Sequence, residues 1–358
     1  MTSRERIDTA FKHREPDRTP MYEYVLLNPI ASKLLGRRYA DYRGYSDEWT
    51  ELVCEKGWEE SIRQYVTDRL DLAQLLGHDM LYVTPNPMPG SSIESASESE
   101  RQSASDPVES VRQRNEEAQR SFAKPPEQIF LVYIYLKAEM QKRGMDLPIL
   151  APAYAHGVWT DVDLMQTMLL APEVAHNHFT HATRSALQYV EAYIQLGVDQ
   201  IGVGGDFAGN RPLISPDVYR RFIMPEVRAV SRRIHESGLW AINASDGNLW
   251  SVINDFLIGC EVDGYLEIDM NAGMDLHRLK QEYGDKTVLY GNMDCGSIMS
   301  FGSVDDVRSR TRECLEAGTG NGGHIFCCSN AITASVPLNN YIAMVATYHE
   351  IFGLPDPG

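Results

Sequence analysis

The chain of 358 residues is short of positive charge. Its 33 lysine and arginine residues stand against 50 aspartate and glutamate residues, which gives a formal net charge of −17 at pH 7. Nucleic-acid binding requires a basic surface that neutralises phosphates, and an acidic protein is repelled by them. The charge balance therefore predicts that nucleic acid is not a partner.

Long apolar runs are missing as well. No stretch approaches the roughly 20 residues that a membrane-spanning helix needs. Residues 1–18 are too polar for a secretory signal. With 43% hydrophobic and 23% charged residues, the composition is that of a globular protein with a large core. We expect a soluble, cytoplasmic protein that does not associate with membranes.

The sequence also lacks the spacing motifs of several common sites. Its six cysteines include no Cys-x-x-Cys pair and do not resemble a disulfide framework, so they are interpreted as reduced thiols. Residues 202–205 are rich in glycine, but they lack the order of a dinucleotide-binding loop and the lysine of a P-loop. A nucleotide-binding fold is therefore rejected.

Short apolar runs that alternate with longer amphipathic stretches indicate parallel strands joined by helices. We predict strands at Met21–Val25, Met80–Val83, Leu147–Ala151, Gln200–Val203, Trp240–Asn243, Gly264–Glu267, Val288–Gly291 and His324–Cys327. Eight strand–helix units in a chain of this length favour a (β/α)8 barrel with extra N-terminal helices. A doubly wound open sheet is the alternative, because a count of strands does not prove closure.

Two helices and one insertion are also predicted. Ser215 is a typical N-cap before Pro216, and a helix over Glu173–Gly197 ends at its glycine. Gly90–Pro107 is rich in serine and glutamate and is interpreted as a solvated insertion, with a lid over the barrel as the alternative. Because no linker is evident, residues 1–358 are expected to form one domain.

Polar residues follow nearly every predicted strand, and ligands bind at the carboxyl ends of parallel strands. The acids Asp206, Asp246 and Glu267 are the predicted catalytic residues, with His156 as a proton donor. Each has a structural alternative: Asp246 could cap a helix that begins at Asn248, and Asp206 could serve only its glycine-rich turn. A carboxylate directly after an apolar strand, as at Glu267, must be partnered or used.

The predicted substrate-binding residues are the other polar side chains at the strand ends: Tyr22, Glu23, Tyr154, Asn243, Asn292 and Asn330. The adjacent Cys327 and Cys328 must face opposite sides of their strand, so at most one of them faces the pocket. A metal held by some of Asp246, Glu267, Cys295 and Cys328 is a further prediction, and this donor set would suit zinc.

Several motifs occur together in one order along the chain. They are SRERIDTAFKHREPDRTP, LISPDVYRRFIMPEV, ASDGNLW, GCEVDGYLEIDMNAGMDLHRLKQEYGDKTVLYGNMDC and GGHIFCCSNAITASVPLNNYIAMVATYHEIFG. In this the chain resembles the uroporphyrinogen decarboxylase superfamily. The resemblance covers most of the chain, is weakest over Gly90–Lys124, and implies a (β/α)8 barrel with a deep polar mouth.

The superfamily that the chain resembles contains decarboxylases and methyltransferases, and the residues after certain strands distinguish them. Uroporphyrinogen decarboxylases carry arginines after the first strand, an aspartate after the second and a histidine after the last. Here these places hold MYEYVLLN with Glu23, LYVTPNP with no aspartate, and Asn330. A polyanionic porphyrinogen would meet a carboxylate where it needs a guanidinium, so decarboxylation in the haem pathway is not expected.

The second branch of the superfamily consists of corrinoid-dependent methyltransferases. Its thiol-methylating members bind zinc through His-x-Cys after one strand and a cysteine after the last, and these places resemble Ala244, Asp246 and Asn330 here. The thiol-activating zinc site is therefore missing. Members that demethylate aryl methyl ethers or quaternary amines vary more at these positions and often keep Asp-Gly at the middle one, and this sequence looks closest to them.

The resemblance predicts a methyltransferase component that takes a methyl group from a small methylated compound, with methoxylated aromatics as the leading class. The acceptor is cob(I)alamin on a corrinoid protein, for which the acidic surface predicts a basic docking patch. A decarboxylase or lyase of a small acid is the alternative, with Arg211 as its carboxylate-binding group. A barrel that only binds a ligand is a third reading, and a homodimer is left open.

Overall fold

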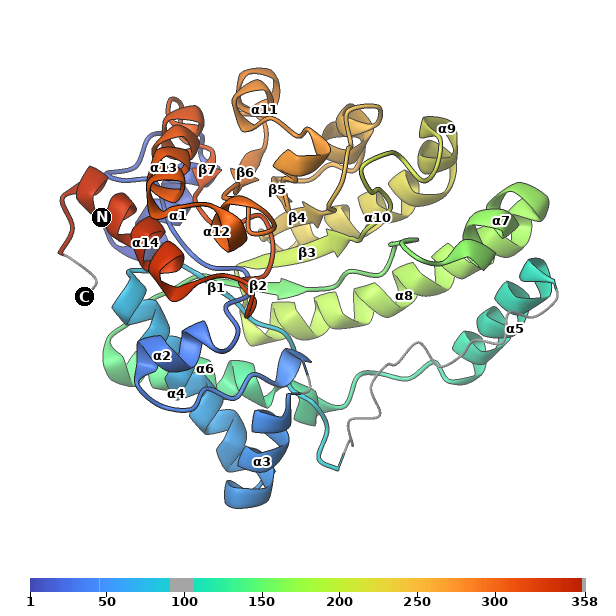
Figure 1. Ribbon diagram of the computed structural model, residues 1–358. Coiled ribbons are helices and arrows are strands. Elements are labelled where there is room, and N and C mark those ends of the chain that lie inside the picture. The colour runs from blue at the N-terminus through green and yellow to red at the C-terminus, as the bar shows by residue number, and fades with distance from the viewer. Residues whose placement is uncertain (45, 91–105, 356–358) are drawn as a thin grey trace.

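The structure is a computed structural model that describes residues 1–44, 46–90 and 106–355 (Figure 1). Most of the predicted insertion at Gly90–Pro107 lies outside the described residues. Seven parallel strands form one sheet, and each strand pairs with its neighbour in the sequence. The strands are β1 (Leu81–Tyr82), β2 (Ile149–Pro152), β3 (Gln200–Gly204), β4 (Trp240–Ala244), β5 (Gly264–Leu266), β6 (Val288–Tyr290) and β7 (His324–Ile325).

The segment at Met21 closes the curled sheet between its two edges. Met21 forms a parallel bridge with Phe326, directly after β7, and its carbonyl accepts a 2.7 Å hydrogen bond from the Asp79 backbone, just before β1. The predicted first strand is thus in place, although it pairs only at the Met21 bridge and at Leu26, which bridges Ile332. A doubly wound sheet would reverse its strand order, and this one does not. The barrel prediction is confirmed.

Helices surround the sheet in an outer layer (Figure 1). They are α1 (Ser3–Phe11), α2 (Ile30–Leu35), α3 (Asp47–Lys56), α4 (Trp58–Leu76), α5 (Pro107–Arg120), α6 (Leu131–Arg143), α7 (Val162–Leu170), α8 (Pro172–Leu196), α9 (Pro216–Val218), α10 (Met224–His235), α11 (Leu276–Tyr283), α12 (Ile298–Phe301), α13 (Val304–Gly318) and α14 (Leu338–Phe352). Of these described helices, none combines the length and apolar character needed to cross a bilayer.

Two predicted helix boundaries are confirmed, and one predicted helix begins later than expected. Pro172 occupies the first turn of α8, and Gly197 ends it with a φ of +64°, a conformation that glycine adopts without strain. The Ser215 side chain accepts a hydrogen bond from the Val218 backbone at 3.3 Å, as an N-cap does. The helix expected to begin at Asn248 begins later, over residues 253–259, which include the turn η4 (Asp255–Gly259), so Asp246 does not cap it.

Alternate strand residues fill the barrel interior with apolar side chains. Among them are Tyr22, Tyr82, Leu150, Ile242, Ala244, Leu266, Tyr290 and Cys327. Phe11 of α1 belongs to the same cluster and stacks on Trp240 at 4.8 Å between ring centroids. The strand residues between them face the helices. For example, the Asn243 amide donates a hydrogen bond to the Phe256 carbonyl at 3.1 Å. This alternation decides which residues after each strand can reach the mouth, the end of the barrel where the carboxyl ends of the strands meet.

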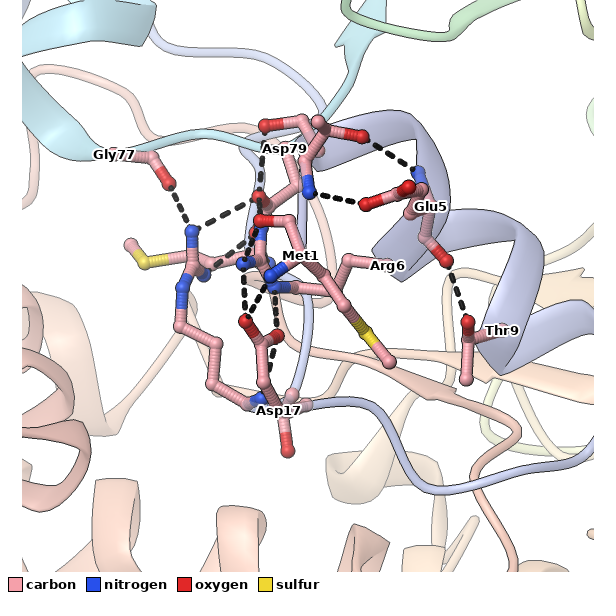
Figure 2. Close-up of polar contacts among 12 residues, drawn as sticks. Met1, Glu5, Arg6, Thr9, Asp17, Gly77 and Asp79 are labelled. Carbon is pink, nitrogen blue, oxygen red and sulfur yellow. Dashed lines mark hydrogen bonds and ion pairs between the residues drawn. The ribbon is translucent and has the colours of Figure 1, made fainter.

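A network of arginines and aspartates lies at the opposite end of the barrel, near the N-terminus (Figure 2). The buried Asp79 carboxylate accepts hydrogen bonds from Arg6 and Arg18, each at 2.6 Å, and from the Met21 backbone at 3.0 Å. Arg6 also binds Asp17 at 2.7 Å. We call these four side chains, Arg6, Asp17, Arg18 and Asp79, the N-terminal clamp. The clamp fixes the closing segment at Met21.

Candidate functional site

Three carboxyl groups from neighbouring strand ends meet at the mouth. Asp206 follows β3, Asp246 follows β4 and Glu267 directly follows β5. One oxygen of each lies within 4.8 Å of the others, which makes them the one group of three potential metal-ligating residues found in the described part of the chain. The structure thus brings together the three acids that the sequence predicted as catalytic. We call them the carboxyl cluster.

The backbone at each strand end aims these side chains. Leu266 faces the barrel interior, so a regular strand would turn Glu267 outward toward the helices. Instead Glu267 has a φ of +72°, which is uncommon for a residue other than glycine and is typical of functional sites. Before Asp206, Gly205 has a φ of +133°, and a Cβ there would lie 2.8 Å from the Gly157 nitrogen. Only glycine allows this close approach.

Hydrogen bonds connect the carboxyl cluster to its neighbours. Asp206 accepts from the Asp246 backbone at 3.0 Å, and the Asp246 side chain accepts from the Asn330 amide at 2.7 Å. The Tyr24 side chain favours the ionised form of Glu267, against the larger effect of burial. All these partners are neutral, in contrast to the arginines of the N-terminal clamp.

Without a cation, the cluster resists ionisation. Burial, and then the charges of Asp206 and Asp269, raise the pKa of Asp246 to about 7. Burial, and then the charges of Asp246 and Asp206, raise the pKa of Glu267 well above its ordinary value. Burial also raises the pKa of Asp206. Carboxyl groups this close cannot all be ionised together, so the cluster holds protons at neutral pH unless a cation replaces them.

Two hollows adjoin the cluster and share Asp206. The inner hollow, about 380 Å³, is lined by Tyr24, Tyr154, Ala155, Gly157, Gly204, Gly205, Asp206, Ala244 and Glu267. The outer hollow, about 530 Å³, is lined by Trp159, Asp206, Ala208, Gly209, Asn210, Asp246, Gly247, Asp269, Asn271, Asp294, Cys295, Gly296, Ser329 and Asn330. None of these described lining residues is a lysine or an arginine. Arg211 is exposed and lines neither hollow.

Two of the residues predicted to bind substrate lie at these hollows. Tyr154 lines the inner one, its ring packs against Gly202, and its hydroxyl is buried without a hydrogen-bond partner. Asn330 lines the outer hollow and holds Asp246. Both are therefore placed where a ligand could contact them.

The other four lie elsewhere. Tyr22 is buried in the barrel interior, and Asn243 faces the helix layer. Asn292 accepts a hydrogen bond from Arg310 of α13 at 3.1 Å. Glu23 is buried on the outer side of the barrel, where its carboxylate accepts from the Cys328 backbone at 3.4 Å, and burial raises its pKa to about 8. None of the four lines either hollow.

His156 is also directed away from the carboxyl cluster. Its Nε2 shares a 2.9 Å hydrogen bond with the Thr183 hydroxyl on α8, and Thr183 donates in turn to Glu226 of α10. The ring is 1% exposed, and burial lowers its pKa to about 4. The histidine is therefore neutral at physiological pH and lies between the sheet and the helices.

The predicted metal ligands are only partly assembled. Asp246 and Glu267 belong to the cluster, but Cys328 is buried against Glu23 and Met344, with sulfur contacts of 3.6 Å to each. Cys295 lines the outer hollow and pairs with the Ser329 hydroxyl at 3.5 Å. The third donor beside Asp246 and Glu267 is thus the Asp206 carboxylate, and a set of three carboxylate oxygens suits hard cations such as Mg²⁺ or Mn²⁺.

The sequence prediction missed Tyr24. In MYEYV, Tyr22 and Tyr24 share one face while Glu23 takes the other. Tyr22 faces the interior, so Tyr24, one step nearer the mouth on the same face, lines the inner hollow. The two-residue period could have identified it once Tyr22 was assigned to the interior.

Comparison with known proteins agrees with this architecture. Residues 150–351 match the uroporphyrinogen decarboxylase (URO-D) family. The chain belongs to this family. The match covers all three residues of the carboxyl cluster and β2 to β7, and it confirms the resemblance seen in the motifs.

Individual relatives are distant. The uroporphyrinogen decarboxylase of Carboxydothermus hydrogenoformans is 24% identical over 193 residues, which cover 54% of this chain and 52% of that protein. The enzyme of Bordetella petrii is 24% identical over 244 residues, 63% of this chain and 65% of that one. The chain thus spans between half and two thirds of the length of these curated relatives.

A solved structure covers the chain more fully. A methyltransferase from Methanosarcina mazei superposes with a TM-score of 0.68 at 17% identity, over 98% of this chain and 99% of that one. At this identity the likeness establishes the barrel fold. The sequence relatives are thus named decarboxylases, whereas this structure is named a methyltransferase.

Proposed function

We propose that this protein moves a methyl group from a small methylated compound, with methoxylated aromatics as the expected class, to a cob(I)alamin carried by a partner protein. The observation that carries the proposal is the convergence of Asp206, Asp246 and Glu267 beside hollows whose described lining holds no lysine or arginine. Such a site is suited to supplying protons to a leaving group and unsuited to holding an anionic substrate.

The reaction divides the work between partner and barrel. Cob(I)alamin, when present, supplies the nucleophile. The barrel must bind the methylated compound and protonate the departing oxygen. As the bond from oxygen to the methyl carbon breaks, its electron pair remains on oxygen, and a carboxyl group of the cluster transfers its proton there. The methyl group leaves on the acceptor, and the demethylated hydroxyl compound is released.

The outer hollow suits an acceptor that approaches from outside. Trp159 lines this hollow and is 51% exposed, so it offers a flat apolar surface beside Asp206. A corrin ring presents a comparable flat face. The methyl donor would then occupy the inner hollow, on the side of Tyr24 and Glu267.

A divalent cation in place of the proton is a second form of the proposal. The carboxyl cluster would hold the cation, which would act as a Lewis acid on the departing oxygen. Zinc was expected from a set with two thiols, whereas three carboxylate oxygens favour Mg²⁺ or Mn²⁺. Metal analysis of the purified protein, with Glu267→Gln beside it, separates the two forms. Equal and negligible metal in both would leave only the proton.

The rival activity is decarboxylation of a small acid on the same barrel. It requires a cation to hold the substrate carboxylate, and the candidate Arg211 is exposed outside both hollows. The geometry therefore supports methyl transfer over this rival. Release of carbon dioxide from small carboxylic acids by the purified protein would reverse that preference.

The direct test incubates the protein with methoxylated aromatics, a corrinoid carrier protein and a reductant. We expect the absorbance of the reduced corrinoid to fall as demethylated product appears. Asp246→Asn should lower the rate by about 10²-fold or more, because a positioned proton donor typically contributes that much. Asp305→Asn, an exposed carboxylate on α13, is the matched control and should change nothing.

Absence of transfer from every methoxylated and methylated compound would contradict the proposal. The partner can be tested in the same assay, because docking of a basic carrier onto an acidic barrel should weaken as salt increases. Transfer that does not depend on ionic strength would remove the predicted basic docking patch.

A further inference from the structure

A third hollow, about 560 Å³, lies beside the inner one and is predominantly aromatic and apolar. It is formed by the closing segment, by the loop after β1, by the single turns η1 (Tyr42–Gly44) and η2 (Glu127–Phe130), and by α8. Its lining residues are Tyr24, Val25, Tyr42, Arg43, Tyr82, Thr84, Pro85, Asn86, Pro87, Met88, Ile129 and Tyr189. We call it the tyrosine hollow.

Tyr24 joins the tyrosine hollow to the carboxyl cluster. It lines both the inner hollow and the tyrosine hollow. Its ring lies 4.4 Å from that of Tyr82, between centroids, and it lines the inner hollow together with Glu267. A molecule that extends past Tyr24 therefore has one end among aromatic rings and the other at the carboxyl groups.

The one cationic side chain among the described residues of this lining is already paired. Arg43 donates from Nε to both carboxylate oxygens of Asp41, at 2.9 and 3.0 Å, and from Nη1 to the Tyr24 carbonyl at 3.3 Å. The Tyr39 hydroxyl donates to the same carboxylate at 3.0 Å. Both charged side chains are almost fully buried. An incoming carboxylate would have to displace Asp41 to reach Arg43.

We infer that the tyrosine hollow binds the aromatic ring of an uncharged methoxyarene and directs its methoxy group past Tyr24 toward Glu267. This assignment rests on the proposed function for the position of the reacting methyl group. Aromatic walls favour a planar apolar ring through burial and through offset or edge-to-face contacts. The carboxylate of a ring acid would lose its hydration in this hollow without gaining a cationic partner, and such burial of an unpaired charge is unfavourable.

Binding of ring compounds to the full chain, without corrinoid, tests the inference by calorimetry. 2-Methoxyphenol and 4-hydroxy-3-methoxybenzoate have the same methoxyphenol ring and differ in one carboxylate. We expect 2-methoxyphenol to bind at least about tenfold more tightly, because the carboxylate would be buried without a partner. Equal or tighter binding of the benzoate would overturn the inference. Tighter binding of phenyltrimethylammonium would overturn it as well, in favour of a cationic methyl donor.

Substitutions at Tyr189 test the location. Tyr189→Leu, at a partly buried position on α8, should weaken binding of 2-methoxyphenol by about fivefold or more through loss of ring contacts. Tyr283→Leu, on α11 outside all three hollows, is the matched control. Tyr189→Arg introduces a cation and should shift the preference toward the benzoate by about tenfold. Unchanged affinity in both Tyr189 variants would place the ring elsewhere.

These measurements are independent of the methyl-transfer assay. Binding of 2-methoxyphenol that responds to Tyr189 while no methyl transfer occurs would leave the subsite standing and overturn the proposed reaction. Methyl transfer from compounds without a ring, with no detectable binding of 2-methoxyphenol, would overturn the subsite and leave the reaction standing.

Discussion

The barrel carries a group of carboxylates at each end, and the two groups differ in their partners. In the N-terminal clamp, Asp79 is 0% exposed and is bound by two arginines at 2.6 Å. In the carboxyl cluster, Asp206, Asp246 and Glu267 have each other and neutral donors. Breaking a buried ion pair destabilises a fold because one charge loses its partner, whereas carboxyl groups without a cationic partner cost free energy and persist where a ligand or reaction uses them. The comparison separates a structural end of the molecule from a functional one.

Removal of the central carboxylate of the clamp should have the largest effect on stability. Asp79→Ala leaves Arg6 and Arg18 without their partner and frees the closing segment at Met21. We expect the free energy of unfolding to fall by about 3–5 kcal/mol, the usual cost of breaking a buried ion pair. Urea unfolding followed by circular dichroism measures it. A loss below about 1 kcal/mol would show that the clamp resembles an exposed ion pair.

Removal of one charge from the carboxyl cluster should instead increase the free energy of unfolding. At pH 8 Asp246→Asn abolishes an ionisation that burial and Asp206 oppose, so the variant should be more stable, by at most about 4 kcal/mol at roughly 1.4 kcal/mol per pKa unit. It should also be the variant that loses methyl transfer. Destabilisation at pH 8 would mean that Asp246 is paired in the native protein, for instance by a bound cation.

The two ends should also respond differently to pH. The hydrogen bond from Arg6 holds the pKa of Asp17 well below its usual range, so its contribution is present above the unfolded pKa near 3.8 and is lost as pH falls. The raised pKa of Asp246 has the opposite effect on stability. The protonated Asp246 contributes to stability below pH 3.8, the pKa of the unfolded chain, and this contribution is lost as the pH rises to about 7. The stability advantage of Asp246→Asn should therefore grow between pH 4 and pH 7.

Unfolding curves of the wild type and Asp246→Asn at several pH values measure this smaller effect. Asp17→Asn provides the comparison, because its stability deficit should shrink as pH falls below 4. Parallel pH profiles in all three proteins would contradict the assignment of opposite pKa shifts to the two ends.

Much of the fold could be predicted because its signals are local. The strand positions follow from apolar runs, and the bounds of α8 follow from Pro172 and Gly197. The first strand was predicted in the right place, yet its pairing at only two bridges depends on the two edges of the curled sheet that it must join. The helix predicted from Asn248 begins only at residue 253, because the Gly247 and Asn248 backbones donate instead to Asp269 and to the Gly209 carbonyl.

The candidate site was only partly predictable. Acids that follow adjacent strands must meet at one end of a barrel, which is why Asp206, Asp246 and Glu267 could be named together. The assignments of Glu23 and Asn243 to the pocket ignored the alternation of strand residues, which turns both toward the helices. The thiols of Cys295 and Cys328 were grouped with the acids by residue type, and neither lies in the cluster.

The sequence by itself determined the barrel, the family and the gathering of acids at strand ends, since periodicity and strand order act through near neighbours along the chain. Tertiary structure decided how the side chains just beyond the strand ends are directed, where the alternation of the strand no longer applies. The positive φ of Glu267 reverses the direction that its strand implies, and the Asp246 side chain is held by the Asn330 amide, 84 residues further along the chain. Such choices depend on distances between residues far apart in the chain, which no local pattern records.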